Sequence, residues 1–295
     1  MPDEDQRGYV LENDAEAERL AYQHSILKAS MGGRLVVAPV DLSRRGIRIL
    51  DSGTSNGVWL SDVRDRLAFP DAATLIGADV SAARFPASAS AGVTFFVHDI
   101  RNPWPPEWKG SFDLVHQRLV LAGAGPHVAE VLRGLLETVA PGGWVQLMEG
   151  VNNGLPQDGP VMCQFRHLMI ELFDSLGTGD SFSADMSRWI NEAGFANVES
   201  RIVPYDIGAK AMDPDLQGKS TQVSCAAASG LVAWANQQSG GITCMNRQDL
   251  DTLELRLRTE LTERGGSFPM RVVWGQKPAE RNMEAENGGT VDGSG

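Results

Sequence analysis

The stretch ILDSGTSNGVWLSDV, residues 49–63, decides the fold of this chain. The apolar residues of GIRIL (46–50) predict a short buried strand, and SNGVWLSDVRDRLA (55–68) predicts a helix. Between them lies a turn that carries Gly53 and Gly57, with Ser55 where a third glycine would be expected. A turn from a strand into a helix is a common ligand site, so this turn is expected to hold a ligand.

The following segments alternate between short apolar strands and helices. Further strands are predicted over 74–80, 93–98, 112–116 and 144–148. A helix with one apolar face is predicted before the last of these strands, from the spacing of Val128, Val131, Leu132, Leu135, Leu136 and Val139. This alternation predicts an α/β protein, a parallel sheet with helices on both faces and a ligand site at the carboxyl ends of its strands. The glycine turn lies at the carboxyl end of the first strand.

The rest of the chain is predicted to be mainly helical. The first helix spans 14–31, and later helices cover a segment around 165–176, then 183–193, 220–238 and 247–264. A sixth strand falls within 194–208 and the last strand within 269–278. The tail, 279–295, has too few apolar residues to fold and is expected to be disordered. The absence of repeats and of a low-complexity linker predicts one domain over 1–278.

Composition excludes several classes of partner. The net charge of −12 would repel phosphate backbones and anionic lipids, and no lysine/arginine run exceeds Arg44-Arg45. Neither a signal peptide nor an apolar stretch of about 18 residues is present, which predicts a cytoplasmic or nuclear protein without a membrane partner. Cys163, Cys225 and Cys244 are odd in number and widely spaced, so we expect reduced thiols and no metal site.

Acidic residues stand at the ends of the first three strands. Asp51, Asp79 and Asp99 should line one crevice, because parallel strand ends meet at one edge of the sheet. This arrangement suggests a nucleoside ligand. Asp79 is placed to accept hydrogen bonds from the ribose hydroxyls, and Asp99 with Ile100 can contact an adenine.

A dinucleotide is the rival nucleoside ligand. It requires three glycines spaced G-x-G-x-x-G, so that a pyrophosphate can rest on the helix N-terminus. The turn here is GTSNG, residues 53–57, and it lacks the third glycine. Asp51 would also repel a pyrophosphate, whereas it would attract a cationic or amino-acid-like group. The predicted ligand therefore carries adenosine and a positive centre.

These segments resemble the class I S-adenosylmethionine-dependent methyltransferases, and within them the fungal secondary-metabolism branch with its regulator-like and gliotoxin-pathway enzymes. The resemblance covers roughly residues 9–275. It rests on six motifs in order: YVLENDAEAERLAYQH, ILDSGTSNGVWL, LIGADVS, FFVHDIRNPWP, SFDLVHQR and LLETVAPGGWVQLMEG. It implies a Rossmann-like sheet of seven strands, mostly parallel, whose last strand near 269–276 runs antiparallel.

The resemblance also implies a set of cofactor contacts. The turn at Gly53 would hold the aminoacyl part of S-adenosylmethionine. A helical lid would cover the core at 46–150 and the acceptor pocket. Its helices lie within 1–45, 160–190 and 220–240, and the first of them carries Tyr22, Gln23 and His24. Ser55 departs from the family, which usually has glycine there, and could either crowd the cofactor or donate a hydrogen bond to it. The expected cofactor-binding residues are Tyr22, Asp51, Gly53, Ser55, Gly57, Asp79, Val80, Asp99, Ile100 and His116.

Methyl transfer requires an aligned nucleophile and, for some acceptors, a base. The candidate bases are His116 at the end of the fourth strand, Glu149 at the end of the fifth, and His24 on the lid helix. A thiolate or amine acceptor needs only orientation, so a base is not required for every acceptor. Several apolar residues lie at helical spacing: Phe165, Met169, Phe173, Met186 and Trp189. They either belong to the core or line a pocket for an apolar or polycyclic acceptor.

The predicted function is S-adenosylmethionine-dependent methylation of O, N or S on a small secondary metabolite. The sequence does not choose among these atoms, and it gives no oligomeric state. One alternative keeps the fold without methyl transfer, as in a protein recruited as a cyclase, a pericyclase or a regulator. Only Ser55 and the lack of an unmistakable base support that alternative.

Overall fold

The computed structural model describes residues 14–152 and 158–279, with side chains from Arg19 onward. Within them, seven strands form one sheet in the order β3-β2-β1-β4-β5-β9-β6. The strands are β1 (Arg48–Ser52), β2 (Thr74–Asp79), β3 (Val93–Val97), β4 (Phe112–Arg118), β5 (Val139–Gly150), β6 (Ala196–Val203) and β9 (Met270–Gln276). Strand β9 is antiparallel to both β5 and β6, and the pairs from β3 to β5 are parallel. The predicted α/β fold class and the antiparallel last strand are confirmed.

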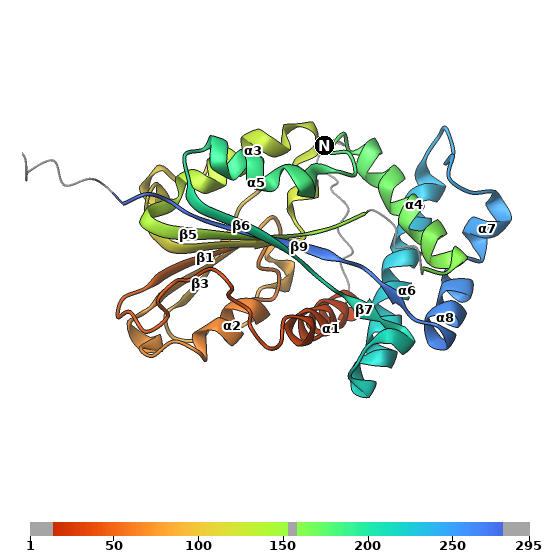
Figure 1. The fold of residues 1–295 in the computed structure, drawn as a ribbon, viewed down its shortest axis with the longest axis horizontal. Coiled ribbons are helices and arrows are strands. Elements are labelled where there is room, and N and C mark those ends of the chain that lie inside the picture. The colour runs from red at the N-terminus through yellow and green to blue at the C-terminus, as the bar shows by residue number, and fades with distance from the viewer. Residues whose placement is uncertain (1–13, 153–157, 280–295) are drawn as a thin grey trace, which may run out of the picture.

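Helices cover both faces of this sheet (Figure 1). The helices α3 (Val128–Glu137) and α5 (Phe182–Glu192) lie on one face, and α1 (Asp14–Ser30) and α2 (Val58–Arg64) lie on the other. A further group gathers at one end of the sheet: α4 (Pro160–Ser175), α6 (Pro214–Gln237), α7 (Arg247–Asp251) and α8 (Leu253–Glu263). The apolar face predicted for α3 is buried, because its leucines and valines pack into the core between helix and sheet. No helix of the described ranges is long and apolar enough to span a bilayer.

Several boundaries differ from the sequence prediction. The helix predicted over 55–68 begins only at Val58, because Ser55 and Gly57 have left-handed φ values of 51° and 72° that a helix cannot contain. The helix predicted over 247–264 is interrupted at Thr252, where φ is −106° and ψ is 2°. The helix predicted over 220–238 starts earlier, at Pro214, because the Asp213 side chain caps it. The polar tail from residue 280 lies outside the described residues.

A small second sheet accompanies the helical end. It pairs β7 (Asp206–Ile207) with β8 (Gly266–Ser267) in antiparallel register. The sixth strand was predicted within 194–208; it ends at Val203, and the chain leaves the large sheet at Pro204 and Tyr205. Residues of this end share one apolar cluster with α1 and the underside of the large sheet. The helical end and the sheet are therefore packed together around a common core.

Candidate cofactor and methyl-transfer site

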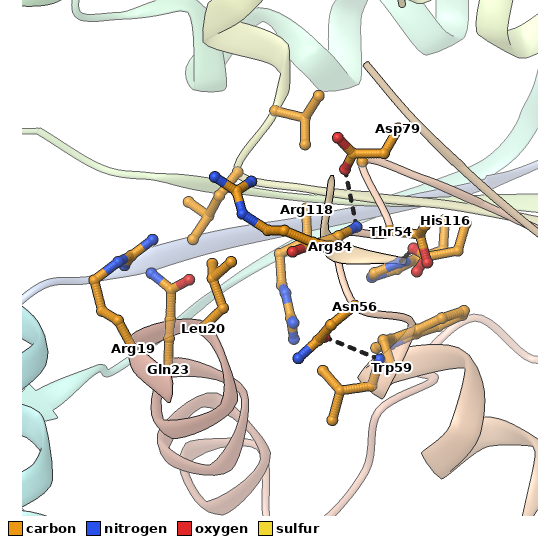
Figure 2. A pocket seen from close by; sticks show the side chains of 16 residues that line it. Arg19, Leu20, Gln23, Thr54, Asn56, Trp59, Asp79, Arg84, His116 and Arg118 are labelled. Carbon is orange, nitrogen blue, oxygen red and sulfur yellow. Dashed lines mark hydrogen bonds and ion pairs between the residues drawn. The ribbon is translucent and has the colours of Figure 1, made fainter. Parts of the chain in front are cut away.

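A cavity of about 290 Å³ lies at the carboxyl ends of β1 and β4 (Figure 2). This volume is near the lower end of small-molecule sites, roughly 300–1,000 Å³. One wall comes from α1 and the opposite wall from the glycine turn and the start of α2. The lining residues are Arg19, Leu20, Gln23, Asp51, Gly53, Thr54, Ser55, Asn56, Val58, Trp59, Asp79, Arg84, His116, Arg118, Leu119 and Val120. Five of the ten predicted cofactor contacts are in this set: Asp51, Gly53, Ser55, Asp79 and His116.

The two glycines of the turn are required by packing as well as by backbone conformation. Gly53 has a φ of 73°, and a Cβ on it would lie 2.1 Å from Cγ2 of Val120. A Cβ on Gly57 would lie 2.6 Å from the ring of Phe95. The N–H groups of Gly53 and Thr54 both donate to the carbonyl of Ala78, at 2.8 and 3.0 Å. The turn is therefore fixed to β2 on one side and covered by Val120 on the other.

Ser55 occupies the strained position of the turn. Its φ of 51° is left-handed, a conformation that favours glycine. Its backbone N–H donates to Oδ2 of Asp79 at 2.9 Å, the contact drawn in Figure 2. Its hydroxyl is buried, and it has no hydrogen-bond partner in the described part of the chain. A buried hydroxyl without a protein partner, in a cavity that also holds Asp79, is a candidate ligand contact.

We expect Ser55→Gly to separate strain from ligand binding. The free protein should become more stable by about 1 kcal/mol, because glycine adopts the left-handed conformation without strain. Cofactor affinity should fall by roughly threefold to tenfold, because a hydrogen-bond donor is lost. Thermal unfolding and calorimetric titration measure the two effects. Tighter cofactor binding by the variant would show that the serine only crowds the site.

Asp51 and His116 form a buried pair next to the turn. Nδ1 of His116 lies 2.7 Å from Oδ1 of Asp51, and both side chains are almost fully buried. The imidazole stacks on Trp59 with ring centroids 3.7 Å apart and planes 2° apart. Burial lowers the pKa of His116 despite the carboxylate, so the neutral ring carries its proton on Nδ1 and donates it to Asp51. Nε2 has no hydrogen-bond partner among the described residues and retains its lone pair.

Arg118 follows on the same face of β4 and was not predicted as a site residue. It lines the cavity, and its Nη2 donates to Nδ1 of His24 at 3.3 Å. Burial lowers the pKa of Arg118, while the charge of Asp51 opposes that shift. The two-residue period of a strand could have identified it, since His116 and Arg118 point to the same face. The site therefore combines a neutral imidazole with a guanidinium on one strand end.

His24 is not brought into the cavity. Its Nε2 donates to Oδ2 of Asp62 at 2.8 Å, and its Nδ1 accepts from Arg118. Lys28 also binds Asp62, at 2.6 Å. With both ring nitrogens bonded, His24 ties α1 to α2 and to β4 and has no free nitrogen to accept a proton from an acceptor. Its role as a base is not supported by this geometry.

Glu149 is likewise engaged by the protein. Its Oε1 accepts hydrogen bonds from the backbone N–H groups of Val120 and Leu121, at 3.0 and 2.9 Å. Burial raises the pKa of this carboxyl to about 7, against the lowering effect of those two bonds. Glu149 does not line the cavity. The carboxylate therefore contacts the loop that forms the cavity wall.

The pKa of Glu149 predicts how stability depends on pH. The folded protein holds this proton up to about pH 7, whereas the unfolded chain releases it near the ordinary value of 4.5. Stability should therefore fall as pH rises from about 4.5 to about 7, by up to about 3 kcal/mol from this group. Glu149→Gln should remove this part of the decline. Urea unfolding of both proteins between pH 5 and pH 8 checks it, and parallel curves would contradict the assignment.

The remaining predicted contacts lie outside the cavity. Tyr22 packs on the core and contacts the Lys219 ammonium through its ring face at 5.5 Å. Gly57 and Val80 are not lining residues, although Val80 follows Asp79 directly and is 52 % exposed. Asp99 binds Arg101 through two guanidinium nitrogens, at 2.6 and 3.0 Å, which lowers its pKa. These positions remain predictions for the adenine end.

Ile100 faces a separate groove. This groove has a volume of about 780 Å³ and lies between the proline-rich segment 102–106 and α3. Trp104 lines it and packs against His98, with ring centroids 4.0 Å apart, and against Trp108 at 5.8 Å. Trp108 is buried in the core on this side of the sheet, and Trp104 is partly buried against it.

Comparison with known proteins identifies the family. The model of a methyltransferase domain matches residues 22–200. A methyltransferase of Aspergillus fumigatus, psoC, is 37% identical over 249 residues, which cover 84% of this chain and 89% of its own length. The N-methyltransferase gliN of the same fungus is 34% identical and covers 94% and 99%. The N-methyltransferase sirN of Leptosphaeria maculans is 32% identical and covers 92% and 95%.

A solved structure shares the fold. It is the complex between the Haloferax volcanii Trm112 methyltransferase activator and the putative methyltransferase, with a TM-score of 0.53 and 18% identity, covering 90% of this chain and 96% of that one. The likeness supports the fold. This chain belongs to the class I S-adenosylmethionine-dependent methyltransferases, in the branch of fungal secondary metabolism.

Proposed function

We propose that this enzyme methylates a nitrogen atom of a small secondary metabolite. The choice of nitrogen rests on the activity given in the names of the relatives. Four relatives that span 90% or more of this chain at 30% to 34% identity are N-methyltransferases, from four fungi. The net charge of −12 supports a small acceptor rather than a nucleic acid.

The residues of the cavity fit S-adenosylmethionine. Ser55 offers a buried hydroxyl without a protein partner in the described ranges, and Asp79 offers carboxylate oxygens for a ribose. Val80 exposes an apolar side chain directly after that carboxylate, where an adenine could cover it. Together with the Gly53 turn, these residues would hold the cofactor, with Asp99 at its adenine end, whereas Ile100 lines the separate groove.

The chain then supplies alignment and a proton acceptor. S-adenosylmethionine would supply an electrophilic methyl carbon, whose bond to the sulfonium sulfur breaks in line as the acceptor bonds to it, with S-adenosylhomocysteine leaving as a neutral thioether. His116, held by Asp51, lines the cavity, and its Nε2 would take the proton that the acceptor nitrogen loses. Of the three predicted bases, only His116 lines the cavity. His24 has both ring nitrogens bonded, and Glu149 bonds the backbone. Arg118, two residues further, would balance negative charge nearby.

The acceptor would enter beside α1. Leu20 and Gln23 line that side of the cavity, next to Arg19. Phe165 and Met186 are buried core residues, so they support packing rather than acceptor contact, and Met169, Phe173 and Trp189 are partly buried against the core. An apolar or polycyclic acceptor therefore rests on the sequence prediction alone. The helices α1, α4 and α6 would form a lid on a single domain over 1–278.

The test is transfer of a labelled methyl group. The enzyme is incubated with methyl-labelled S-adenosylmethionine and a panel of small heterocycles that carry N–H, O–H or S–H groups. We expect label on nitrogen and an equal amount of S-adenosylhomocysteine. Label on oxygen or sulfur would overturn the choice of nitrogen. Conversion of an acceptor without release of S-adenosylhomocysteine would favour the cyclase alternative.

A further inference from the structure

The chain leaves β4 through a strained residue. Leu119 has a φ of 55°, the left-handed conformation that is unfavourable for a residue with a Cβ. Its N–H still donates to the carbonyl of Met148 at 2.9 Å, so it is held at the edge of β5. Val120 follows with a φ of −127° and a ψ of −29°. Successive residues of opposite hand turn their N–H groups to one side, which forms a concave anion-binding nest.

An anion from the protein itself fills this nest. The Oε1 atom of Glu149 accepts from the N–H groups of both Val120 and Leu121. Glu149 is only 3% exposed, so these bonds offset part of the cost of burying its carboxylate. We call Leu119, Val120 and Leu121 the β4 nest. By bonding the N–H groups of the two residues that follow Leu119, the Glu149 carboxylate holds Leu119 in its strained conformation.

The β4 nest packs against the glycine turn. Cγ2 of Val120 occupies the space that a Cβ on Gly53 would fill, with 2.1 Å between the two positions. Leu119, Val120 and Gly53 all line the cavity. A shift of the nest would therefore move the wall of the cavity and open a gap beside the turn. Glu149 is connected to the turn through one backbone segment, although it does not line the cavity.

We propose that Glu149 is a positioning residue whose carboxylate fixes the β4 nest and so sets the cofactor-binding position of Val120 against Gly53. It acts through the backbone and not on the acceptor. This assignment replaces the sequence prediction that Glu149 could be a base. It depends on the methyl donor binding at the Gly53 turn but not on the identity of the acceptor atom.

Three variants of Glu149 test the proposal at pH 8, where the carboxyl is ionised. Glu149→Gln retains a carbonyl oxygen that can accept both N–H groups, so the Kd for S-adenosylhomocysteine should stay within about threefold of the wild type. Glu149→Leu removes the acceptor but keeps the approximate size, so the Kd should rise by about tenfold or more. If Glu149→Leu does not fold, Glu149→Asp, which withdraws the carboxylate by one methylene, replaces it with the same expected direction.

Glu260 provides a matched control. It is also buried, and its two oxygens accept from the backbone N–H groups of Val161 and Met162, at 3.0 and 2.7 Å. These groups belong to the first turn of α4, and neither Glu260 nor its partners line the cavity. Glu260→Leu should lower thermal stability while the Kd for S-adenosylhomocysteine stays within about threefold of the wild type. A rise in the Kd for Glu149→Leu but not for Glu260→Leu therefore cannot come from a general loss of stability.

The kinetic readout separates positioning from catalysis. For Glu149→Leu we expect KM for S-adenosylmethionine to rise while kcat at saturating cofactor stays within about threefold. A Kd for Glu149→Leu equal to that of Glu260→Leu would overturn the proposal. So would a loss of about a hundredfold in kcat for Glu149→Gln with unchanged Kd, because that pattern belongs to a base. If the wild type fails to bind S-adenosylhomocysteine at all, the cofactor assignment fails first, and titration of the wild type shows this directly.

Discussion

Gly53→Ala should weaken S-adenosylmethionine binding by about a hundredfold or more and destabilise the free protein by about 2–4 kcal/mol. Two physical causes add at this position. The φ of 73° is unfavourable for alanine, and the new Cβ would collide with Cγ2 of Val120. The turn must then shift from the Ala78 carbonyl to which it is bonded, and the cavity loses its shape. Calorimetric titration and urea unfolding measure the two effects.

The cause can be resolved with a second substitution. In a Val120→Ala background Cγ2 is removed and only the Cβ of residue 120 remains, at 3.1 Å, so the added penalty of Gly53→Ala should shrink towards that of backbone strain, roughly 1–2 kcal/mol. Gly218→Ala is the matched glycine control, because this residue lies in α6 with no atom within 4 Å of its ideal Cβ position. It should leave cofactor binding unchanged. Equal penalties for Gly53→Ala in both backgrounds would contradict the packing argument.

His116→Asn should lower kcat by roughly a hundredfold to a thousandfold while the Kd for the cofactor changes by less than about threefold. The asparagine amide can still donate a hydrogen bond to Asp51, so the buried carboxylate keeps a partner. What is lost is the basic Nε2 that the neutral imidazole presents at the cavity. Steady-state kinetics at saturating S-adenosylmethionine, together with titration, separates the two quantities.

The pH dependence gives an independent check of His116. Because burial lowers its pKa below 6.5, the wild-type kcat should remain flat from pH 8 to pH 6.5 and fall only at lower pH. Asp51→Asn should lower kcat by about tenfold or more, since the ring loses the charged, acceptor-only carboxylate that fixes its tautomer, and the amide nitrogen can favour the other one. An unchanged kcat in His116→Asn would show that orientation alone suffices. A raised Kd with normal kcat would make His116 a cofactor contact.

The sequence was most informative about the sheet. Short apolar segments that alternate with helical ones predicted the parallel strands, because such segments are typical of strands buried on both faces, and the last four residues of β1 are buried. The antiparallel β9 came only from the family resemblance, since a strand's direction leaves no trace in its own periodicity. The helix after the glycine turn was predicted too long, because the left-handed φ of Ser55 could not be read from a serine.

The candidate site was only partly predictable. Asp51, Asp79 and His116 stand at strand ends, and the shared edge of a parallel sheet brings them together whatever the loops do. Val120 and Glu149 could not be assigned in this way. Their roles depend on a left-handed Leu119 and on a contact with Gly53 across two strands, neither of which has a local sequence pattern. Glu149 was therefore interpreted as a base, from its strand-end position alone.

The central claim is that the Gly53 turn and Asp79 bind the methyl donor, and calorimetric titration of S-adenosylmethionine tests it most directly. The wild type should bind one equivalent with an affinity in the micromolar range, about −8 kcal/mol. Asp79→Ala should bind at least tenfold more weakly, because it loses both the ribose acceptor and the bond that fixes Ser55. No heat and no thermal shift with the wild type, or equal affinity of the two proteins, would contradict the account.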